Sequence, residues 1–430
     1  MSNTILKYLS LISDNLWLTV VILVSILGIY FTFTLKGIQF NVKRMIKYLF
    51  KKDNTSPSGL SSFKTLSIAL AGRIGVGSIS GIALAIYLGG PGTIFWIWII
   101  AIISAIIAYS ETYLGVKYKE KGNDGIHNGG PEFYINKVLH KPKLAKLYIL
   151  VFAFCYVFGF NSVQSNTITK AISHSFNLTP WIVSLCIAIF TFIVVFKGQK
   201  KVADATSKLV PFMSLLYIII AIIVIIKNIT IIPNIFTSII RNALNIKPFV
   251  SGFLSTMIIG TKRGIFSNEA GLGTGSIAAA SGNSDDAIKE GFIQMFGIYI
   301  TSIIICTCTG LIVLSSNYNN LIVNDPNGIE IASSSFIYHL GTPGNTILTI
   351  IITLFAFSTI LSGYYYGISA LKYLFKKDYS ILLKIATIII VFLGGIISST
   401  ISWTLTDLLI AILVIINIIS IFFLRKEIQS

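Results

Sequence analysis

The sequence predicts an all-α polytopic membrane protein, a chain that crosses the bilayer many times. Hydrophobic residues make up 54% of its 430 residues, and charged residues only 11%. The mean hydropathy is +0.82, whereas a soluble domain needs far more charge to cover its surface. Two of the long apolar stretches are also interrupted by glycine clusters. No polar stretch is long enough to enclose a soluble core.

About eleven transmembrane helices are expected from the apolar segments. The first segment is expected to stay in the mature protein as a membrane span. Few charges precede it and the basic residues follow it, which is the reverse of a cleavable signal peptide. The spans are expected at residues 16–35, 62–87, 93–113, 147–169, 181–196, 209–226, 249–280, 291–315, 345–370, 381–399 and 403–424.

The net charge of +17 follows the expected topology. With the amino terminus outside and the carboxyl terminus in the cytoplasm, 25 of the 33 Lys and Arg residues fall in cytoplasmic segments and five in external ones. This is a strong positive-inside bias. The charge is therefore attributed to topology rather than to a nucleic-acid partner. We expect a multi-pass protein of the plasma membrane, which in a bacterium is the inner membrane.

The two interrupted stretches lie at matching places in the two halves of the chain. Ser67–Tyr87 is broken by the glycines of 72–78, and Pro248–Ala280 is broken at 260–264 and at 271–276. Glycine costs about 1 kcal/mol in a helix interior, and unpaired backbone groups cost more in lipid. Such paired breaks are the best pointer in a sequence to the binding site of a secondary transporter.

The remaining spans divide into two sets of five. Residues 1–61 hold the additional first span and a basic amphipathic segment, residues 62–226 the first set, and residues 227–430 the second. The first broken span would enter from the cytoplasm and the second from outside. This opposite direction predicts a 5+5 inverted repeat.

The first break carries groups that suit a zwitterion. Unwinding at Gly75–Ser78 frees N–H groups, which favour a carboxylate at a helix amino terminus, and carbonyl groups, which favour a cation. An amino acid transported together with Na⁺ or H⁺ would meet both. The alternative is close helix packing through small residues four apart, as in Gly77/Gly81 and Gly271/Gly275.

Four ionisable residues, Arg73, Lys262, Arg263 and Glu269, are expected at or near membrane depth. Such residues are costly there and usually pair or face a cavity. We expect Glu269 to pair with Arg73 or Arg263, as a gate or as a structural clamp. The alternatives are that Lys262 and Arg263 extend to the membrane interface, and that Glu269 carries a proton.

Two polar groups in apolar spans leave their roles open. The adjacent hydroxyls of Ser358 and Thr359 either bond back to the carbonyl four residues earlier or hold a hard cation such as Na⁺. Gln164 lies in the polar run 159–167, where such side chains either join helices or contact a polar ligand.

Five segments distributed along the chain carry specific motifs. They are Gly260–Ala280, Ala71–Trp98, Gly129–Pro131 before Tyr134-Ile135, Val163–Asn166 and Lys208–Met213. Together they resemble the alanine/glycine:cation symporter family, the sodium:alanine symporters, over nearly the whole chain. The resemblance implies the leucine-transporter-like fold, a 5+5 inverted repeat, here with one extra amino-terminal helix.

The resemblance also implies roles for individual residues. Substrate contacts are implied for Gly75, Gly77, Ser78, Gln164, Gly271, Gly273 and Thr274. Na⁺ binding is implied for Ser358 and Thr359, with carbonyls around Gly72 and Gly75. The family usually has Asn where this chain has Ser78. The shorter side chain enlarges the expected substrate pocket and makes serine a candidate substrate beside alanine and glycine.

The sequence therefore predicts a Na⁺-coupled importer of small neutral amino acids. The alternatives are an H⁺-coupled or serine-preferring transporter and an amino-acid-gated channel or sensor on the same fold. No P-loop, HExxH motif or nucleophile and base set is present in the sequence, so neither an enzyme nor a cofactor is expected. The expected partners are the amino acid, Na⁺ and the bilayer; the sequence does not determine an oligomeric state.

Overall fold

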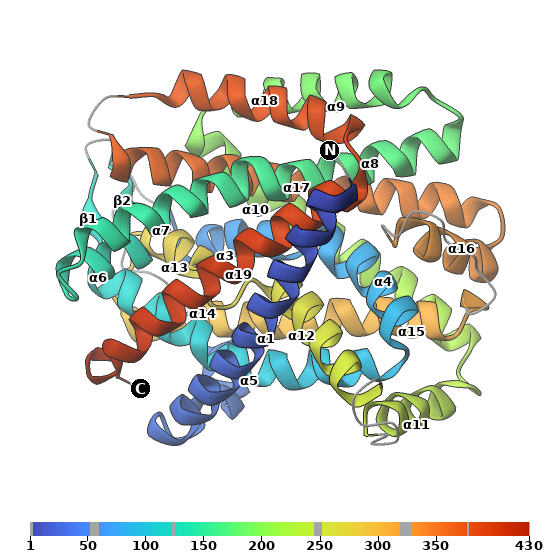
Figure 1. Cartoon of the computed structure of the whole chain (residues 1–430), viewed down its shortest axis with the longest axis horizontal. Helices are drawn as coiled ribbons and strands as arrows, with labels where there is room; N and C mark the ends of the chain where they lie inside the picture. Colours follow the sequence, from blue (N-terminus) through green and yellow to red (C-terminus); the bar gives the residue numbers. More distant parts are fainter. Residues whose placement is uncertain are drawn as a thin grey trace.

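The computed structural model describes residues 3–51, 60–122, 125–244, 252–318, 328–375 and 378–429, and these are mostly helical (Figure 1). The first half contains α1 (Asn3–Thr34), α2 (Val42–Leu49), α3 (Ser62–Arg73), α4 (Ile82–Gly89), α5 (Gly92–Lys117), α6 (Pro131–Lys137), α7 (Pro142–Phe154), α8 (Asn161–Phe176), α9 (Pro180–Val195) and α10 (Gln199–Lys227), with strands β1 (Glu120–Lys121) and β2 (His127–Asn128). The second half contains α11 (Ile232–Ala243), α12 (Leu254–Asn268), α13 (Thr274–Ala280), α14 (Ala287–Ile298), α15 (Cys306–Leu314), α16 (Ile329–Leu340), α17 (Pro343–Leu374), α18 (Ser380–Ile396) and α19 (Ser399–Phe423).

Several of these helices are long and apolar enough to cross a membrane. Among the described residues there are seven: α1, α5, α7 joined to α8, α10, α14 joined to α15, α17 and α19. An eighth is a bent pair, in which α3 and the helix of Gly77–Gly89 meet at 50°. The expected all-α polytopic class is confirmed.

Two helix boundaries differ from those expected or cannot be compared with them. The expected start of the second broken span at 248–251 lies outside the described residues, and the helix is described from Leu254. The first span is longer than expected, because α1 already begins at Asn3.

The broken helices lie in the middle of the bundle. Residues 65–86 and 263–282 are buried without exception. A helix that is buried on all sides belongs to the interior of a structure. Around them, α3 packs against α10 and α17, and α12 and α13 pack against α5.

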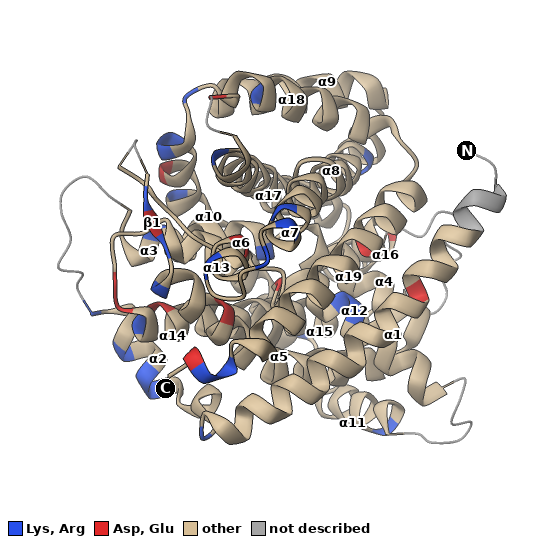
Figure 2. Ribbon diagram, turned by 60° about the vertical axis from the view of Figure 1, so that its left-hand side comes forward, with Lys and Arg blue, Asp and Glu red and all other residues tan. Residues whose placement is uncertain are grey.

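The outer helices pack in two groups. α9 and α18 lie side by side along one edge of the bundle and both contact α8 (Figure 1). α1 runs beside α19 and also contacts α5. In Figure 2 the parts of the ribbon that belong to Lys and Arg gather around α2, β1 and the carboxyl terminus, and few charged residues are coloured in the middle of the bundle.

Candidate functional site

The first break lies between α3 and the π-helical turn Gly77–Gly81 that opens α4. α3 ends at Arg73, and Ile74 leaves the helical conformation with φ −89° and ψ 69°. The freed Val76 N–H donates to Gln164 Oε1 on α8 at 3.0 Å. Gln164 therefore lies directly at the break.

Close approach of side chains requires two of the glycines in this break. A Cβ atom at Gly75 would lie 2.3 Å from Thr359 Oγ1 of α17. A Cβ atom at Gly77 would lie 2.6 Å from the ring of Phe266 on α12. Both distances are far below van der Waals contact. Only glycine lets the hydroxyl and the ring come this near to the backbone.

Oxygen atoms of α3 and α17 converge beside Gly75. Thr359 Oγ1 lies 2.8 Å from the Ala71 carbonyl oxygen and 3.1 Å from that of Phe355. Ser358 Oγ lies 3.3 Å and 2.8 Å from the same two carbonyl oxygens. All four residues are buried. Both hydroxyls donate to these carbonyls, and hydroxyl and carbonyl oxygens are also ligands that a hard cation prefers.

The carbonyls of this cluster differ in part from those expected. Gly72 and Gly75 were expected to complete the cation shell, but the Ala71 carbonyl makes the closest contact. The Gly72 carbonyl lies 3.4 Å from Thr359 Oγ1, and the Gly75 carbonyl accepts the Ser78 N–H at 3.1 Å. The reason is that α3 remains helical through Arg73. The carbonyls without a helical partner therefore belong to its last turn, which includes Ala71, and not to the residues of the break itself.

Ser78, just after the break, contacts α12 and α15 rather than α17. Its Oγ is 2.8 Å from Ser267 Oγ and 3.1 Å from the Arg73 carbonyl oxygen. Its own carbonyl accepts from Thr309 Oγ1 at 2.7 Å. The hydroxyl of Ser78 is thus tied to α12, and Ser267 is a neighbour that the sequence analysis did not single out.

The second break, between α12 and α13, depends on left-handed backbone. Glu269, Gly271 and Gly273 have φ of 56°, 83° and 85°. Glycine adopts this conformation freely, whereas a glutamate is strained there. Such strain persists only where the surroundings hold the residue in place.

Scaffold residues hold the second break. Glu111 Oε2 on α5 accepts the Gly273 N–H at 3.0 Å and Asn417 Nδ2 at 2.8 Å. Asn417 Nδ2, on α19, also lies 2.9 Å from the Gly271 carbonyl oxygen, and Tyr148 donates to the Leu272 carbonyl at 2.6 Å. The freed backbone groups of this break are therefore paired with α5, α7 and α19.

The predicted substrate residues consequently fall into two groups. Gly75, Gly77, Ser78 and Gln164 come together at the first break, while Gly271 and Gly273 face the scaffold. The contacts of these two glycines thus do not support the expectation that they share a pocket with Gly75. The side chains of α12 that reach the first break are Phe266 and Ser267. The positions of the glycines in the sequence could not reveal these contacts, because they do not give the direction that the chain takes between one glycine and the next.

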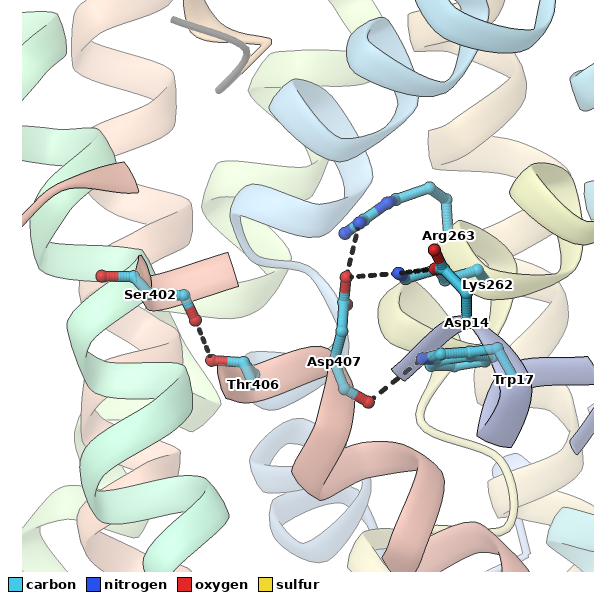
Figure 3. A network of polar contacts seen from close by, with 7 residues as sticks. All are labelled: Asp14, Trp17, Lys262, Arg263, Ser402, Thr406 and Asp407. Carbon is cyan, nitrogen blue, oxygen red and sulfur yellow. Dashed lines mark hydrogen bonds and ion pairs between the residues drawn. The ribbon is translucent and has the colours of Figure 1, made fainter. Parts of the chain in front are cut away.

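A first buried charge centre, which we call the aspartate centre, comprises Lys262, Arg263 and Asp407 (Figure 3). Arg263 Nη2 and Lys262 Nζ lie 2.8 and 2.9 Å from the same oxygen, Asp407 Oδ2. Only 2% of Asp407 is exposed. The Arg263 guanidinium also lies 4.5 Å from the centre of the Trp403 ring, at cation–π distance.

The additional helix α1 is attached to this centre. Trp17 Nε1 donates to the Asp407 carbonyl at 3.1 Å, and Asp14 lies 3.7 Å from Lys262 (Figure 3). Of the two partners expected for Glu269, Arg263 pairs instead with Asp407, and Arg73 is the one that lies near Glu269. The sequence analysis missed Asp407 because it is 144 residues away from Arg263 along the chain.

A second buried charge centre, the glutamate centre, comprises Arg73, Glu111 and Glu269. Arg73 Nη1 donates to the Gln294 carbonyl at 3.1 Å. The guanidinium fills a recess left by two glycines, since a Cβ atom at Gly275 would lie 2.5 Å from Arg73 Nη2. Among the described residues, neither carboxylate oxygen of Glu269 has a hydrogen-bond partner. Arg73 lies near both carboxylates without a direct hydrogen bond to either.

Comparison with known sequences identifies the family. The profile of the sodium:alanine symporter family matches residues 2–430. The chain belongs to the sodium:alanine symporter family. A probable sodium/glutamine symporter, GlnT of Bacillus subtilis, is 36% identical over 420 residues, which cover 96% of this chain and 87% of GlnT. The sodium/alanine symporter AgcS of Methanococcus maripaludis is 34% identical over 412 residues, covering 94% of this chain and 91% of AgcS.

Two solved structures share the fold of this symporter. A Na⁺-coupled sialic acid symporter in an outward-open state has a TM-score of 0.56 at 14% identity, covering 97% of this chain and 83% of that one. A manganese transporter of Eremococcus coleocola has a TM-score of 0.59 at 10% identity, covering 87% and 83%. The chain is thus a multi-pass membrane transporter of a Na⁺-coupled family and not an enzyme.

The symporter is closed around the first break. Gly75, Ser78, Gln164 and Thr359 are all buried. A cavity of about 280 Å³ lies between α8, α16 and α17, and its lining includes Lys170, Ser333, Asn345, Leu348 and Thr349. On α17 the residues at 348, 352, 355 and 359 follow helical spacing along one face, which leads from this cavity to the oxygen cluster.

Proposed function

We propose that this symporter imports small neutral amino acids, alanine or glycine first, together with Na⁺. The observation that carries the proposal is the oxygen cluster of Ala71, Phe355, Ser358 and Thr359 next to the broken backbone at Gly75. A cation bound there would join α3 to α17 across the break. Binding of Na⁺ would thus order the backbone to which the amino acid binds.

The architecture that we propose is the 5+5 inverted repeat after one additional helix. The two broken spans α3–α4 and α12–α13 and the two shorter apolar helices α9 and α18 join the seven long spans to give eleven. Residues 1–61, 62–226 and 227–430 are then the additional helix with its basic segment, the first repeat and the second repeat. The amino terminus lies outside and the carboxyl terminus in the cytoplasm, because the basic residues then gather on the cytoplasmic side.

The amino acid would bind at the first break through Gly75, Gly77, Ser78 and Gln164. Gln164 Oε1 now takes the Val76 N–H. A substrate carboxylate would compete for the same N–H, since helix amino termini favour anions. The Phe266 ring, packed on Gly77, limits the room for a substrate side chain. Thr274, at the amino end of α13, remains a proposed contact, whereas Gly271 and Gly273 serve to hold the second break.

Access from outside would pass through the cavity between α8, α16 and α17. Along α17, the buried side chains of Ile352 and Phe355 follow Leu348 of the cavity lining and precede Thr359. The aspartate centre would close the neighbouring side, because Arg263 contacts Trp403, and Trp403 packs on Phe266 with ring centres 4.7 Å apart. Alternating access would then require Phe266 to leave Gly77.

The experiment is uptake of radiolabelled alanine into proteoliposomes with an inward Na⁺ gradient, or with choline replacing Na⁺. Concentrative uptake with Na⁺ only is expected, and a membrane potential adds about 2.3 kcal/mol per charge and 100 mV. Equilibration without accumulation in both salts would identify a channel instead. Competition by unlabelled glycine, serine and glutamine ranks the substrates. Inhibition by glutamine alone would overturn the preference for small side chains.

A matched pair of variants tests the cation site. Ser358→Ala with Thr359→Ala removes two of the four oxygens, so the Na⁺ concentration for half-maximal uptake should rise at least tenfold, about 1.4 kcal/mol. The control is Ser369→Ala on the same helix, because its hydroxyl only bonds back to the Tyr365 carbonyl. Equal Na⁺ dependence of both variants would contradict the assignment.

A further inference from the structure

The carboxylate of Glu269 lies next to the oxygen cluster, against Gly72. We propose that Glu269 supplies the negative charge that holds the co-transported cation at Ser358 and Thr359, acting through space as a positioning residue. This inference rests on the proposed Na⁺ coupling. The oxygen cluster itself consists only of neutral hydroxyl and carbonyl groups.

The geometry brings the carboxylate to the edge of the cluster. A Cβ atom at Gly72 would lie 2.9 Å from Glu269 Oε2 and 3.3 Å from Oε1. Gly72 follows Ala71, whose carbonyl is 2.8 Å from Thr359 Oγ1. One backbone residue therefore separates the carboxylate from the cluster. The missing side chain at Gly72 is what permits this approach.

The carboxylate of Glu269 lacks a directly paired counter-charge. Glu269 is fully buried, and neither of its oxygens is in a well-formed hydrogen bond with a described residue. The groups around it are the Arg73 guanidinium and the hydroxyls of Thr274, Tyr156 and Tyr366. A buried carboxylate in such a setting requires a positive partner.

A charge count of the glutamate centre leaves room for one cation. Glu111 and Glu269 are two carboxylates, and the charged group shared between them is Arg73. Arg73 is anchored to the Gln294 carbonyl and lies in the recess between Gly275 and Gly297, where Cβ atoms would be 2.5 and 2.7 Å from it. It is therefore held toward α13 and α14. With both carboxylates ionised, one Na⁺ at the oxygen cluster would make the centre neutral.

This arrangement couples Na⁺ to the fold of both breaks. Glu269 ends α12 in left-handed backbone, and Gly72 is in the last turn of α3. A cation attracted to both would draw the two broken helices together. Without the cation, the carboxylate is left buried and uncompensated, which disfavours the closed arrangement of the breaks.

The test is Glu269→Gln, which keeps the shape of the side chain and removes its charge. Na⁺ binding to the purified protein is followed by tryptophan fluorescence and by the Na⁺-induced rise in melting temperature, with choline as the reference salt. The half-saturating Na⁺ concentration should rise about 10- to 100-fold, as expected for a charge several ångströms away at an effective dielectric constant near 20. The affinity for alanine at saturating Na⁺ should stay within about threefold of the wild-type value, because the lost negative charge acts on the cation and not on the amino acid.

Control variants separate this role from a structural one. Glu290→Gln removes another buried carboxylate, in the first turn of α14, where it accepts from Ser62 at the end of α3 remote from Gly72, and should leave the Na⁺ response unchanged. Glu269→Asp keeps the charge but withdraws it by one methylene, so the Na⁺ response should return in large part. If Glu269→Gln does not fold, Glu269→Asp still tests the proposal through a few-fold rise in half-saturating Na⁺.

The outcomes distinguish this inference from the proposed function. A wild-type protein with no Na⁺ response would overturn both. Na⁺-dependent wild-type uptake with an unchanged Na⁺ response in Glu269→Gln and Glu269→Asp would overturn only the role of Glu269. Uptake driven by a pH gradient without Na⁺, and lost in Glu269→Gln, would show that the carboxylate carries a proton and would also overturn the inference.

Discussion

The aspartate centre and the glutamate centre are both buried, yet only the first is internally paired. Asp407 receives Arg263 and Lys262 at 2.8 and 2.9 Å. Glu269, in contrast, has no hydrogen-bond donor among the described residues. The first centre joins α1, α12 and α19, and the second lies between the two breaks. The first centre therefore holds helices together, whereas the second is the one at which we propose that the cation acts.

The physical reason is the cost of unpaired charge away from water. Paired charges at membrane depth are tolerated, and an incomplete set persists only where function requires it. The backbone shows the same contrast. The second break is satisfied by Glu111, Asn417 and Tyr148, whereas the first break is lined by Gln164 and by the oxygen cluster.

The largest effect on stability is expected from Asp407→Asn. This change leaves Arg263 buried without a counter-charge, which costs about 3–5 kcal/mol. Lys262 is partly exposed and keeps Asp14 at 3.7 Å. Thermal unfolding and size-exclusion chromatography of the purified protein measure it. The control is Asp14→Asn, because 69% of the Asp14 side chain is exposed. Equal stability of the two variants would remove the contrast between the centres.

The largest effect on transport without loss of folding is expected from Gly75→Ala. Its Cβ atom would lie 2.3 Å from Thr359 Oγ1 and 3.1 Å from Gln164 Oε1. The hydroxyl must then leave the oxygen cluster, so Na⁺-dependent uptake should fall to background while the protein still elutes as a single species. Gly81→Ala in the same broken span is the control, because its nearest neighbour would be 3.6 Å away. Retained uptake in Gly75→Ala would count against the cluster as a cation site.

Smaller losses of stability, of different size, are expected when the two basic residues of the aspartate centre are replaced one at a time. Arg263→Met should lower the free energy of unfolding by about 1.5–3 kcal/mol, since it removes a buried charged hydrogen bond and the contact with Trp403. Lys262→Met should lower it by about 1 kcal/mol or less, because Lys262 is nearer to the surface and the pair of Arg263 with Asp407 stays balanced. The reverse order in chemical unfolding would show that Lys262 is the principal partner.

The smallest effect is expected from Trp17→Phe. The change removes the hydrogen bond from Trp17 Nε1 to the Asp407 carbonyl and keeps most of the apolar contact. A loss of about 1 kcal/mol in unfolding free energy follows, with Na⁺ affinity unchanged. A change in Na⁺ affinity would show that α1 acts on the cation site as well as on the aspartate centre.

Much of the fold could be predicted because lipid imposes simple rules. Apolar length marks the spans, and the glycine clusters mark the breaks, since each freed backbone group needs a partner. Within the candidate site, the proximity of Gln164, Thr359 and Gly75 followed from a family resemblance, and their atomic contacts did not. Asp407 was missed because a single acidic residue in an apolar span carries no sign of its partner.

The sequence by itself determined the membrane class, the two broken helices and the presence of ionisable groups at membrane depth. Composition and glycine position are local properties, and they act through local backbone energies. Only the tertiary structure decided that Arg263 pairs with Asp407, that Ala71 rather than Gly75 faces the hydroxyl pair, and that Glu269 lies against Gly72. These contacts join segments that are far apart in the chain. They depend on the direction in which each broken helix continues after its break, which the local sequence does not determine.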